Sequence, residues 1–320
     1  MILMGRIIKS LSGVFDIYSG NKVYVCRGRG KLKLDDKIYV GDLVEFDDAG
    51  LSIEKILPRK NKITRPYVAN IDLLLAVVAP VPAPDFILFD KLIIEARHSG
   101  IDIYLCCNKS DLGSMLDKAR KQYTDCVDGI FEVSAVTGEG IEDILEVSRG
   151  KLACLCGQSG VGKSSIINTL AEFIIVENSN PSPQTRTTLI KDSEQLLAQC
   201  PRNLSLSPKK LMTAVSDISK RIDRGKNTTR HTEIYTIAGA HIIDTPGFGL
   251  IEPENIDPAQ LSYYFEDMHK LSENCRYPDC RHKNEPDCAV IYAVGEGIFS
   301  AERYKRYIKI YDELFSKRQF

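Results

Sequence analysis

Hydrophobic and polar positions change their pattern twice along the chain, and the first pattern ends near residue 63. Up to that point, short runs rich in β-branched and aromatic residues, such as KVYVCRGRG (22–30) and KIYVGDLVEF (37–46), alternate with turn residues. Five such runs in about sixty residues predict five short strands and favour a small β-barrel. An SH3-like barrel is the alternative, because the pattern separates the two barrel types poorly.

The second pattern begins with IDLLLAVVA (71–79), a continuous apolar run typical of a strand that is buried on both faces. A helical pattern closed by Gly100 follows, and then the apolar run IDIYLCC (101–107). Apolar and helical segments go on alternating through KLACLC (151–156) and the helix after it. This alternation predicts a doubly wound parallel sheet.

The third pattern is helical and ends in AERYKRYIKIYDELFSKRQF. The chain therefore divides into a barrel at 1–63, an α/β domain at 64–252 with an insertion at about 173–212, and a smaller helical domain at 253–320. Arg303, Lys305, Arg306 and Tyr307 on the last helix are candidates for RNA contact, with a solvated helix face as the alternative.

Composition adds few restrictions. A chain of 320 residues has room for two or three domains, and its 43% hydrophobic and 27% charged residues are typical of a globular protein. The net charge of -1 means that any nucleic-acid contact depends on local patches such as RGRGKLK (27–33) and RKNK (59–62), which are otherwise solvated loops. We find no membrane-spanning run and no signal peptide, so a cytoplasmic location is expected, with reduced cysteines.

GQSGVGKSS (157–165) fits the phosphate-loop pattern between an apolar strand and a helix. Glycines let the backbone wrap closely around phosphates, Lys163 would contact the β- and γ-phosphates, and the Ser164 hydroxyl would bind Mg²⁺. The alternative is a glycine turn before a helix. The predicted contacts to the nucleotide are Gly157, Gln158, Ser159, Gly160, Val161, Gly162, Lys163, Ser164 and Ser165.

Guanine specificity is indicated by NKSD (108–111), which ends another predicted strand. Asp111 can accept two hydrogen bonds from N1–H and the amino group of guanine, which adenine cannot donate. Asn108 would brace the loop, and the stem of Lys109 would lie against the base. The remaining predicted contacts are Ser110 in the same loop and Ser134 and Ala135 after the next strand, where the Ala135 amide would lie near the guanine O6.

DTPG (244–247) follows the strand AHIID, so that Asp244 would hold Mg²⁺ through water and the Gly247 amide would sense the γ-phosphate. In an ordinary GTPase the phosphate loop precedes the guanine motif, whereas here it follows. A chain can be cut at a surface loop and its old ends joined without changing the sheet. The reversed order therefore indicates a circular permutation. Because DTPG leads almost directly into the C-terminal segment, its rearrangement is expected to move that segment.

These motifs resemble the ribosome small-subunit-dependent GTPases of the RsgA/YjeQ/YloQ type. The resemblance extends over nearly the whole chain and includes RGRGKLK, RPYVANID, NKSDL, GQSGVGKSS, RGKNTTRHTE and DTPGF. It implies an OB-fold, a circularly permuted GTPase domain and a zinc-binding tail. It also implies a role in late maturation of the small ribosomal subunit, which stimulates GTP hydrolysis.

Switch I of this family resembles RGKNTTRH (224–231), where Thr228 or Thr229 would complete the coordination of Mg²⁺. Arg224 lies 61 positions after Lys163, which is unusually far. The insertion contains a second threonine-rich stretch, NPSPQTRTTLIK (180–191), which is the alternative location.

Phe248 occupies the position after DTPG, where many GTPases have a water-orienting glutamine, so intrinsic hydrolysis should be slow and depend on a partner. His231 is a candidate for the missing catalytic role, and the alternative is a surface histidine without one.

The tail contains four residues suited to one metal ion: Cys275, Cys280, His282 and Cys288, spaced C-x4-C-x-H-x5-C. Four such ligands predict one structural Zn²⁺ with no open coordination position. A chance cluster of reduced cysteines is the alternative.

The sequence and the resemblance together indicate a GTP hydrolase that uses GTP/GDP, Mg²⁺ and one structural Zn²⁺. The resemblance implies binding to the small ribosomal subunit and its rRNA, and we expect a monomer with no membrane contact. The alternatives are a permuted GTPase of large-subunit assembly and an RNA-binding assembly scaffold that keeps GTP as a structural ligand.

Overall fold

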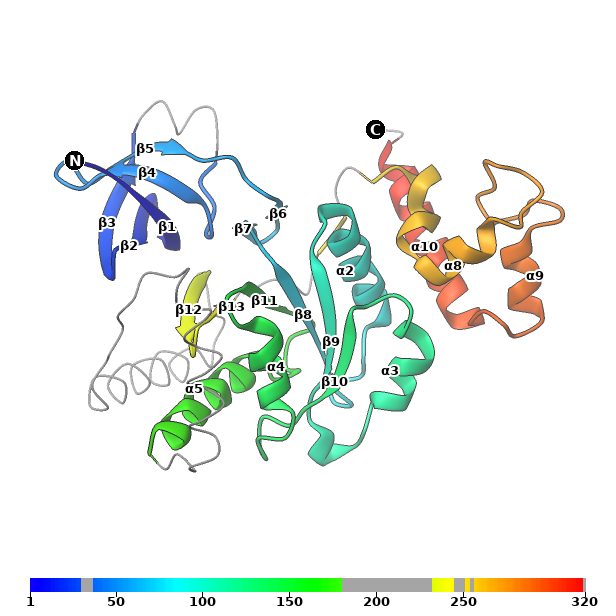
Figure 1. Cartoon of the computed structure of the whole chain (residues 1–320). Coiled ribbons are helices and arrows are strands. Elements are labelled where there is room, and N and C mark those ends of the chain that lie inside the picture. Colours follow the sequence, from blue (N-terminus) through cyan, green and yellow to red (C-terminus); the bar gives the residue numbers. More distant parts are fainter. Residues whose placement is uncertain (30–36, 180–231, 245–250, 254–255, 319–320) are drawn as a thin grey trace.

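A computed structural model describes residues 1–29, 37–179, 232–244, 251–253 and 256–318, and of residues 173–179 it describes only the helix backbone. Figure 1 shows three parts: a β-barrel that contains the N-terminus, a central sheet flanked by helices, and a helical C-terminal part. This combination confirms the predicted fold class. No helix in the described residues is long and apolar enough to cross a membrane.

The N-terminal part is a closed barrel. Its strands are β1 (Ile2–Leu11), β2 (Val14–Ser19), β3 (Lys22–Gly28), β4 (Leu43–Asp47) and β5 (Ser52–Ile56). They are hydrogen-bonded in the order β1-β2-β3-β5-β4, and β4 pairs back with β1. The β3–β5 pair is parallel. A closed five-stranded barrel with this order matches the OB type rather than the SH3-like alternative.

The central sheet has its most buried strands in the middle. Its strands are β8 (Leu73–Val78), β9 (Asp102–Cys107), β10 (Gly129–Glu132), β11 (Leu152–Cys156), β12 (Glu233–Ile237) and β13 (Ala240–Asp244). They lie in the order β10-β9-β8-β11-β13-β12, and every neighbouring pair is parallel except β12–β13. All six residues of β8 are buried, as its unbroken apolar sequence predicts.

Helices cover both faces of this sheet. α2 (Phe86–Ser99) and α3 (Leu116–Tyr123) pack on one face, and α4 (Ile141–Ser148) and α5 (Lys163–Ser179) on the other. The carboxylate of Asp85 caps α2 by accepting hydrogen bonds from the backbone N–H groups of Ile87 and Leu88. Gly100, in the left-handed conformation at φ 62°, ends the helix.

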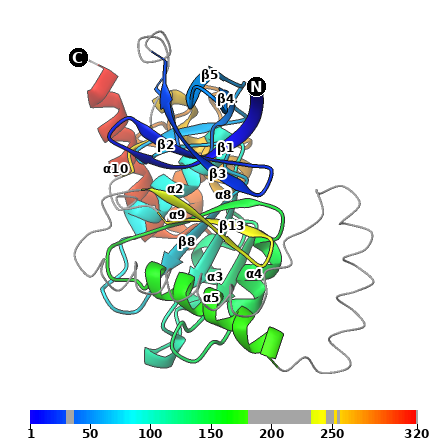
Figure 2. The same cartoon turned by 90° about the vertical axis from the view of Figure 1, so that its left-hand side faces the viewer.

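The barrel continues into the central sheet at one point. Lys9 of β1 pairs with Glu233 of β12, and their side chains form an ion pair of 3.1 Å. In both views the barrel lies over β12 and β13 (Figures 1 and 2). A separate hairpin of β6 (Lys62–Thr64) and β7 (Tyr67–Ala69) lies between the barrel strands and β8 in sequence. The domain boundaries after residues 63 and 252 stay predictions.

The C-terminal part has its own apolar core. It contains the 3-10 segment η3 (Pro258–Tyr264) and the helices α8 (Glu266–Ser272), α9 (Ala289–Gly295) and α10 (Ala301–Arg318). Phe265, Met268, Tyr307 and Ile310 lie in this core, which also includes Ile94 of α2. The C-terminal part therefore packs directly on α2.

Three residues of α10 lie where neither sequence interpretation placed them. Arg303, Arg306 and Tyr307 are 1%, 9% and 1% exposed, so they form neither an RNA-contacting nor a solvated face. Both arginines pair with buried or half-buried carboxylates of other helices, which makes their burial possible. Lys305, in contrast, is exposed.

Candidate nucleotide site and metal centre

The candidate nucleotide site lies at the carboxyl ends of the parallel strands. The loops after β11, β9 and β10 carry the phosphate loop, NKSD and the Ser134–Ala135 pair, and β13 ends at Asp244. In open α/β sheets, ligands bind in the crevice outside this edge. The fold thus brings together motifs that lie far apart in the sequence.

The turn between β11 and α5 needs its glycines. The φ angles are 128° at Gly157, 82° at Gly160 and 97° at Gly162, all in the range that favours glycine. A Cβ atom at Gly157 would collide with the carbonyl oxygen of Val77, and one at Gly162 with the Asn108 side chain. The backbone N–H groups of such a loop and of the helix start after it form a surface that binds anions.

Lys163 and Asp244 supply the charges at this edge. The Lys163 Nζ donates hydrogen bonds to the carbonyl oxygens of Gly157 (2.8 Å) and Gln158 (2.9 Å). Burial lowers the pKa of Lys163, and burial raises the pKa of Asp244, while each charge opposes the other's shift. The Asp244 Oδ2 is buried without a hydrogen-bond partner in the described part of the chain. Such a carboxylate oxygen fits a hydrated Mg²⁺ ion held through water.

Asn108 connects three loops through one side chain. It is 1% exposed, and its Nδ2 donates a 2.7 Å hydrogen bond to the carbonyl oxygen of Val161 in the phosphate loop. Its Oδ1 accepts a 3.2 Å hydrogen bond from the backbone N–H of Ala135. Both ends of the amide are used, so Asn108 has the geometry of the predicted brace.

Lys109 runs along the phosphate loop. Its Nζ donates 2.8 Å hydrogen bonds to the carbonyl oxygens of Val81 and Gly160. The backbone at Lys109 is left-handed, with φ at 64°. The Nζ end of the side chain is therefore held in place, and the alkyl stem can form one side of a slot for the base.

Asp111 is oriented by a serine of the neighbouring loop. The Ser134 hydroxyl donates a 2.6 Å hydrogen bond to the Asp111 Oδ1 and accepts one from the backbone N–H of Thr137 at 3.2 Å. The Asp111 side chain is otherwise exposed and can accept the two hydrogen bonds that guanine donates. The Ser110 hydroxyl donates to the Glu139 Oε2 at 3.0 Å, a second tie between these loops that the sequence analysis missed.

The segment between β8 and α2 is also part of the site and was missed. The Gln158 Nε2 donates a 3.0 Å hydrogen bond to the carbonyl oxygen of Ala83, and its Oε1 accepts one from the backbone N–H of Asp85 at 3.2 Å. Because both ends of its side-chain amide are hydrogen-bonded, Gln158 can contact a phosphate only through its backbone N–H. Main-chain groups carry no residue signature, so this contact could not be predicted from the sequence.

The other predicted site residues divide between described and undescribed parts of the chain. Ser159 and Ser165 are exposed, Ser164 is half-buried in the first turn of α5, and Val161 is 1% exposed. Thr228, Thr229, His231, Gly247 and Phe248 lie outside the described residues, as do residues 180–212 of the insertion.

The four predicted metal ligands come together in the C-terminal part. The ligand atoms of Cys275, Cys280, His282 and Cys288 all lie within 4.8 Å of one another. The Cys275 and Cys288 sulfurs are 3.9 Å apart, and the His282 Nδ1 lies 3.6 Å from the first and 3.4 Å from the second. In a tetrahedral zinc site, bonds of about 2.3 Å to sulfur and 2.0 Å to nitrogen imply S···S and S···N separations of about 3.8 and 3.5 Å. The cluster therefore fits one Zn²⁺.

The loop that carries these ligands is shaped by local hydrogen bonds. The Glu285 carboxylate accepts hydrogen bonds from the backbone N–H groups of Arg281, Lys283 and Asn284. Two tyrosines of α10 donate to carbonyl oxygens of the loop: Tyr304 to His282 at 2.7 Å and Tyr307 to Arg281 at 3.0 Å. α10 thus holds the metal loop in place.

Comparisons with known proteins agree with this arrangement. The profile of the RsgA GTPase family matches residues 56–188 and 203–253, and that of the RsgA N-terminal domain matches residues 4–51. The chain is 32% identical over 316 residues to the small ribosomal subunit biogenesis GTPase RsgA of Thermotoga maritima, covering 96% of this chain and 94% of that protein. It is 34% identical over 326 residues to RsgA 2 of Listeria monocytogenes, covering 99% of each.

Two solved structures have the same overall fold. The crystal structure of YjeQ from Thermotoga maritima matches with a TM-score of 0.70 and 28% identity, over 98% of this chain and 99% of that one. The structure of YloQ, described as a circularly permuted GTPase, matches with a TM-score of 0.68 and 25% identity, over 99% and 96%. The chain therefore belongs to the RsgA GTPase family, a family of circularly permuted GTP hydrolases.

Proposed function

We propose that this protein binds the small ribosomal subunit, assists its late maturation, and hydrolyses GTP to GDP and phosphate when the subunit stimulates it. The observation that carries the nucleotide chemistry is the Asn108 side chain, which joins the phosphate loop to both base-recognition loops. The partner is supported by the names of the relatives, which are small ribosomal subunit biogenesis GTPases.

The bound nucleotide would be held by residues at the carboxyl edge of the sheet. Asp111, oriented by Ser134, accepts hydrogen bonds from guanine, and the Lys109 stem lies along the base. Lys163 would exchange its hydrogen bonds to the two loop carbonyl oxygens for contacts to the β- and γ-phosphates, which bind in the same loop. Mg²⁺, when bound, would neutralise charge on the phosphates, and we assign its binding to Ser164 and Asp244.

Hydrolysis would depend on residues outside the described part. We propose that Thr228 or Thr229 completes the coordination of Mg²⁺ when the γ-phosphate is bound. The Gly247 amide would contact the γ-phosphate, and His231 would orient the attacking water. Phe248 cannot orient water, because a phenyl ring has no hydrogen-bonding group. Rapid hydrolysis then requires the partner to supply or position a group that orients the attacking water.

Docking on the subunit would use the barrel and the C-terminal part, which lie on opposite sides of the central sheet in Figure 1. OB-type barrels commonly bind nucleic acid, and Arg27 and Arg29, at and just after the end of β3, provide positive charge for rRNA. We propose a cytoplasmic monomer that carries one structural Zn²⁺ in its C-terminal part.

The test is GTP turnover by the purified full-length protein alone and with small subunits, large subunits or whole ribosomes. Strong stimulation by small subunits alone is expected. Stimulation by large subunits only would assign the protein to large-subunit assembly instead. Tight GTP binding without stimulation by any particle would favour an assembly scaffold, the alternative that Phe248 supports.

A further inference from the structure

The start of helix α2 lies beside the phosphate loop. Asp85, the residue before the helix, caps α2 with its carboxylate and donates a hydrogen bond from its backbone N–H to the Gln158 side chain. The Gln158 Nε2 also donates a hydrogen bond to the carbonyl oxygen of Ala83, two residues before Asp85. One amide therefore fastens the start of α2 to the loop that would carry the phosphates, and a shift of that loop is transferred to the helix end.

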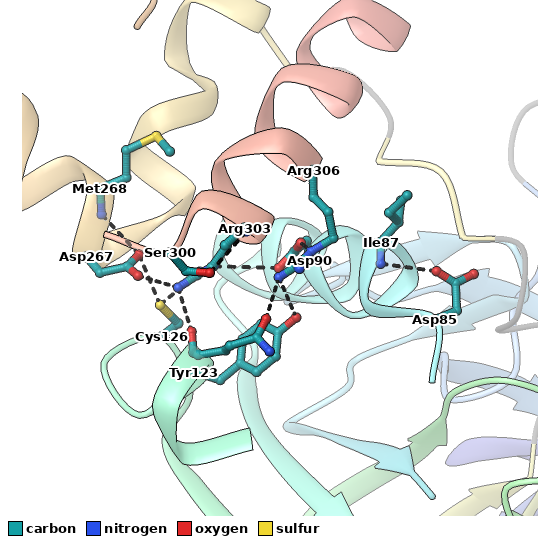
Figure 3. A network of polar contacts seen from close by, with 11 residues as sticks. Asp85, Ile87, Asp90, Tyr123, Cys126, Asp267, Met268, Ser300, Arg303 and Arg306 are labelled. Carbon is teal, nitrogen blue, oxygen red and sulfur yellow. Dashed lines mark hydrogen bonds and ion pairs between the residues drawn. The ribbon is translucent and has the colours of Figure 1, made fainter. Parts of the chain in front are cut away.

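One turn further along, α2 is fastened to the C-terminal part by a buried charge cluster, shown in Figure 3. The Asp90 side chain is 0% exposed and pairs with the Nε of Arg306 through one oxygen, while its other oxygen lies 3.7 Å from the Nε of Arg303. Both arginines belong to α10. Arg303 also pairs with Asp267 of α8, so the cluster contains two positive and two negative groups.

The same two arginines also hold α3. The Arg303 Nη1 donates a 2.8 Å hydrogen bond to the carbonyl oxygen of Gln122, and the Arg306 Nη2 donates to the Gln122 Oε1 at 3.0 Å. A further bond of 3.1 Å runs from Arg306 to the Tyr123 hydroxyl. Since α3 follows the NKSD loop, α10 is connected to two of the helices that follow the loops of the nucleotide site, α2 and α3.

Buried charges give this junction one preferred geometry. A buried ion pair adds little net stability, but removing one partner leaves an uncompensated charge, which is strongly unfavourable. Asp90 cannot therefore move away from α10 without carrying Arg303 and Arg306 along. α10 in turn holds the metal loop through Tyr304 and Tyr307. A displacement of α2 would therefore also displace α10 and, with it, the metal loop.

We propose that α2 transmits the occupancy of the phosphate loop to the C-terminal part, with Gln158 as the positioning residue at one end and the Asp90 cluster at the other. The proposal rests on the proposed function only in requiring that guanine nucleotide binds at this loop. It adds a connection separate from the covalent one through residues 245–250, because it runs through α2 and through contacts between described residues.

The experiment is hydrogen–deuterium exchange of the full-length protein with Mg²⁺, measured without nucleotide, with GDP and with a non-hydrolysable GTP analogue. Peptides from α10 (301–318) are expected to exchange at least about threefold more slowly with bound nucleotide. In Gln158→Ala, less than half of that change should remain. Gln158→Glu, which can accept from Asp85 but cannot donate to Ala83, should give an intermediate value.

The matched control breaks a peripheral contact between the same two helices. Lys91 of α2 and Glu313 of α10 form a 2.7 Å ion pair at a more exposed position. Glu313→Gln should leave the nucleotide-dependent change in α10 intact. Direct titration with a fluorescent GTP analogue shows for each variant whether nucleotide is bound.

Two results would overturn the proposal while leaving the proposed function standing: nucleotide binding without any change in α10, or a full change in Gln158→Ala that still binds nucleotide. Absence of nucleotide binding by the unaltered protein would instead remove the proposed function and this inference with it.

Discussion

At the residue scale, the site is built from amide side chains whose two ends serve different loops. Asn108 bonds Val161 and Ala135, and Gln158 bonds Ala83 and Asp85. The sequence predicted Asn108 because its motif specifies one chemistry. The second role of Gln158 could not be predicted, because its partners are main-chain groups of a segment without a motif.

Asp111 gives the sharpest test at this scale. Asp111→Asn replaces one of the two acceptor oxygens by an NH2 donor, so the amino group of guanine loses its acceptor and faces a second donor. Xanthine, with a carbonyl in place of that amino group, can accept a hydrogen bond from the new donor. GTP affinity should fall by a factor of at least about 100, equivalent to about 2.7 kcal/mol, and XTP should bind better than GTP. Competition titration with the two nucleotides measures this.

Asp117→Asn is the control for charge, because Asp117 is an exposed acid on α3 close to the same loop. It should leave both affinities unchanged. Equal loss in the two variants would mean that Asp111 acts through net charge and does not read the base.

At the element scale, continuous apolar runs predicted the buried strands, and turn residues separated the barrel strands. α10 was the exception. Its arginines read as exposed because charge normally indicates a solvated face, whereas Arg303 and Arg306 are buried by partners on α2, α3 and α8. Such partners are distant in sequence, so no local pattern reveals them.

The metal loop is an element that we expect to need its ion. The purified protein should contain about one Zn²⁺ per chain, and Cys288→Ser should lose it, because three ligands bind far less tightly than four. Elemental analysis after dialysis measures the metal. The thermal unfolding midpoint should fall in the variant and in chelated protein alike.

Cys26→Ala removes a buried barrel cysteine that lies outside the cluster and serves as the control. It should keep its Zn²⁺ even though it loses some stability. Full metal content in Cys288→Ser would show that the cluster does not bind the ion as proposed.

At the scale of the whole molecule, the sequence predicted three parts and the permuted order of the motifs. The way in which the parts join was not predictable, since it depends on single contacts such as Lys9–Glu233 and Asp90–Arg306. Each joins residues more than 200 positions apart in the chain. Only the folded structure places such residues side by side.

The contact between α2 and α10 predicts that breaking two different ion pairs lowers the free energy of unfolding by very different amounts. Arg306→Met should destabilise the protein by about 3–5 kcal/mol, because it leaves Asp90 buried without its main partner. Glu313→Gln should cost less than about 1 kcal/mol, because its pair with Lys91 is partly exposed. Urea unfolding followed by circular dichroism compares them, and similar losses would show that the cluster is not specially sensitive.

The position of β8 in the middle of the sheet also affects how the chain is made. A protein leaves the ribosome N-terminus first, so β8, β9 and β10 emerge with their helices before β11. Until β11 arrives, the most apolar strand of the sheet has an open edge. In an unpermuted GTPase that strand is made after the phosphate-loop strand it pairs with. The nascent chain should therefore pass through a stage in which this edge needs protection, and chaperone contact should be greatest just before residue 152 emerges.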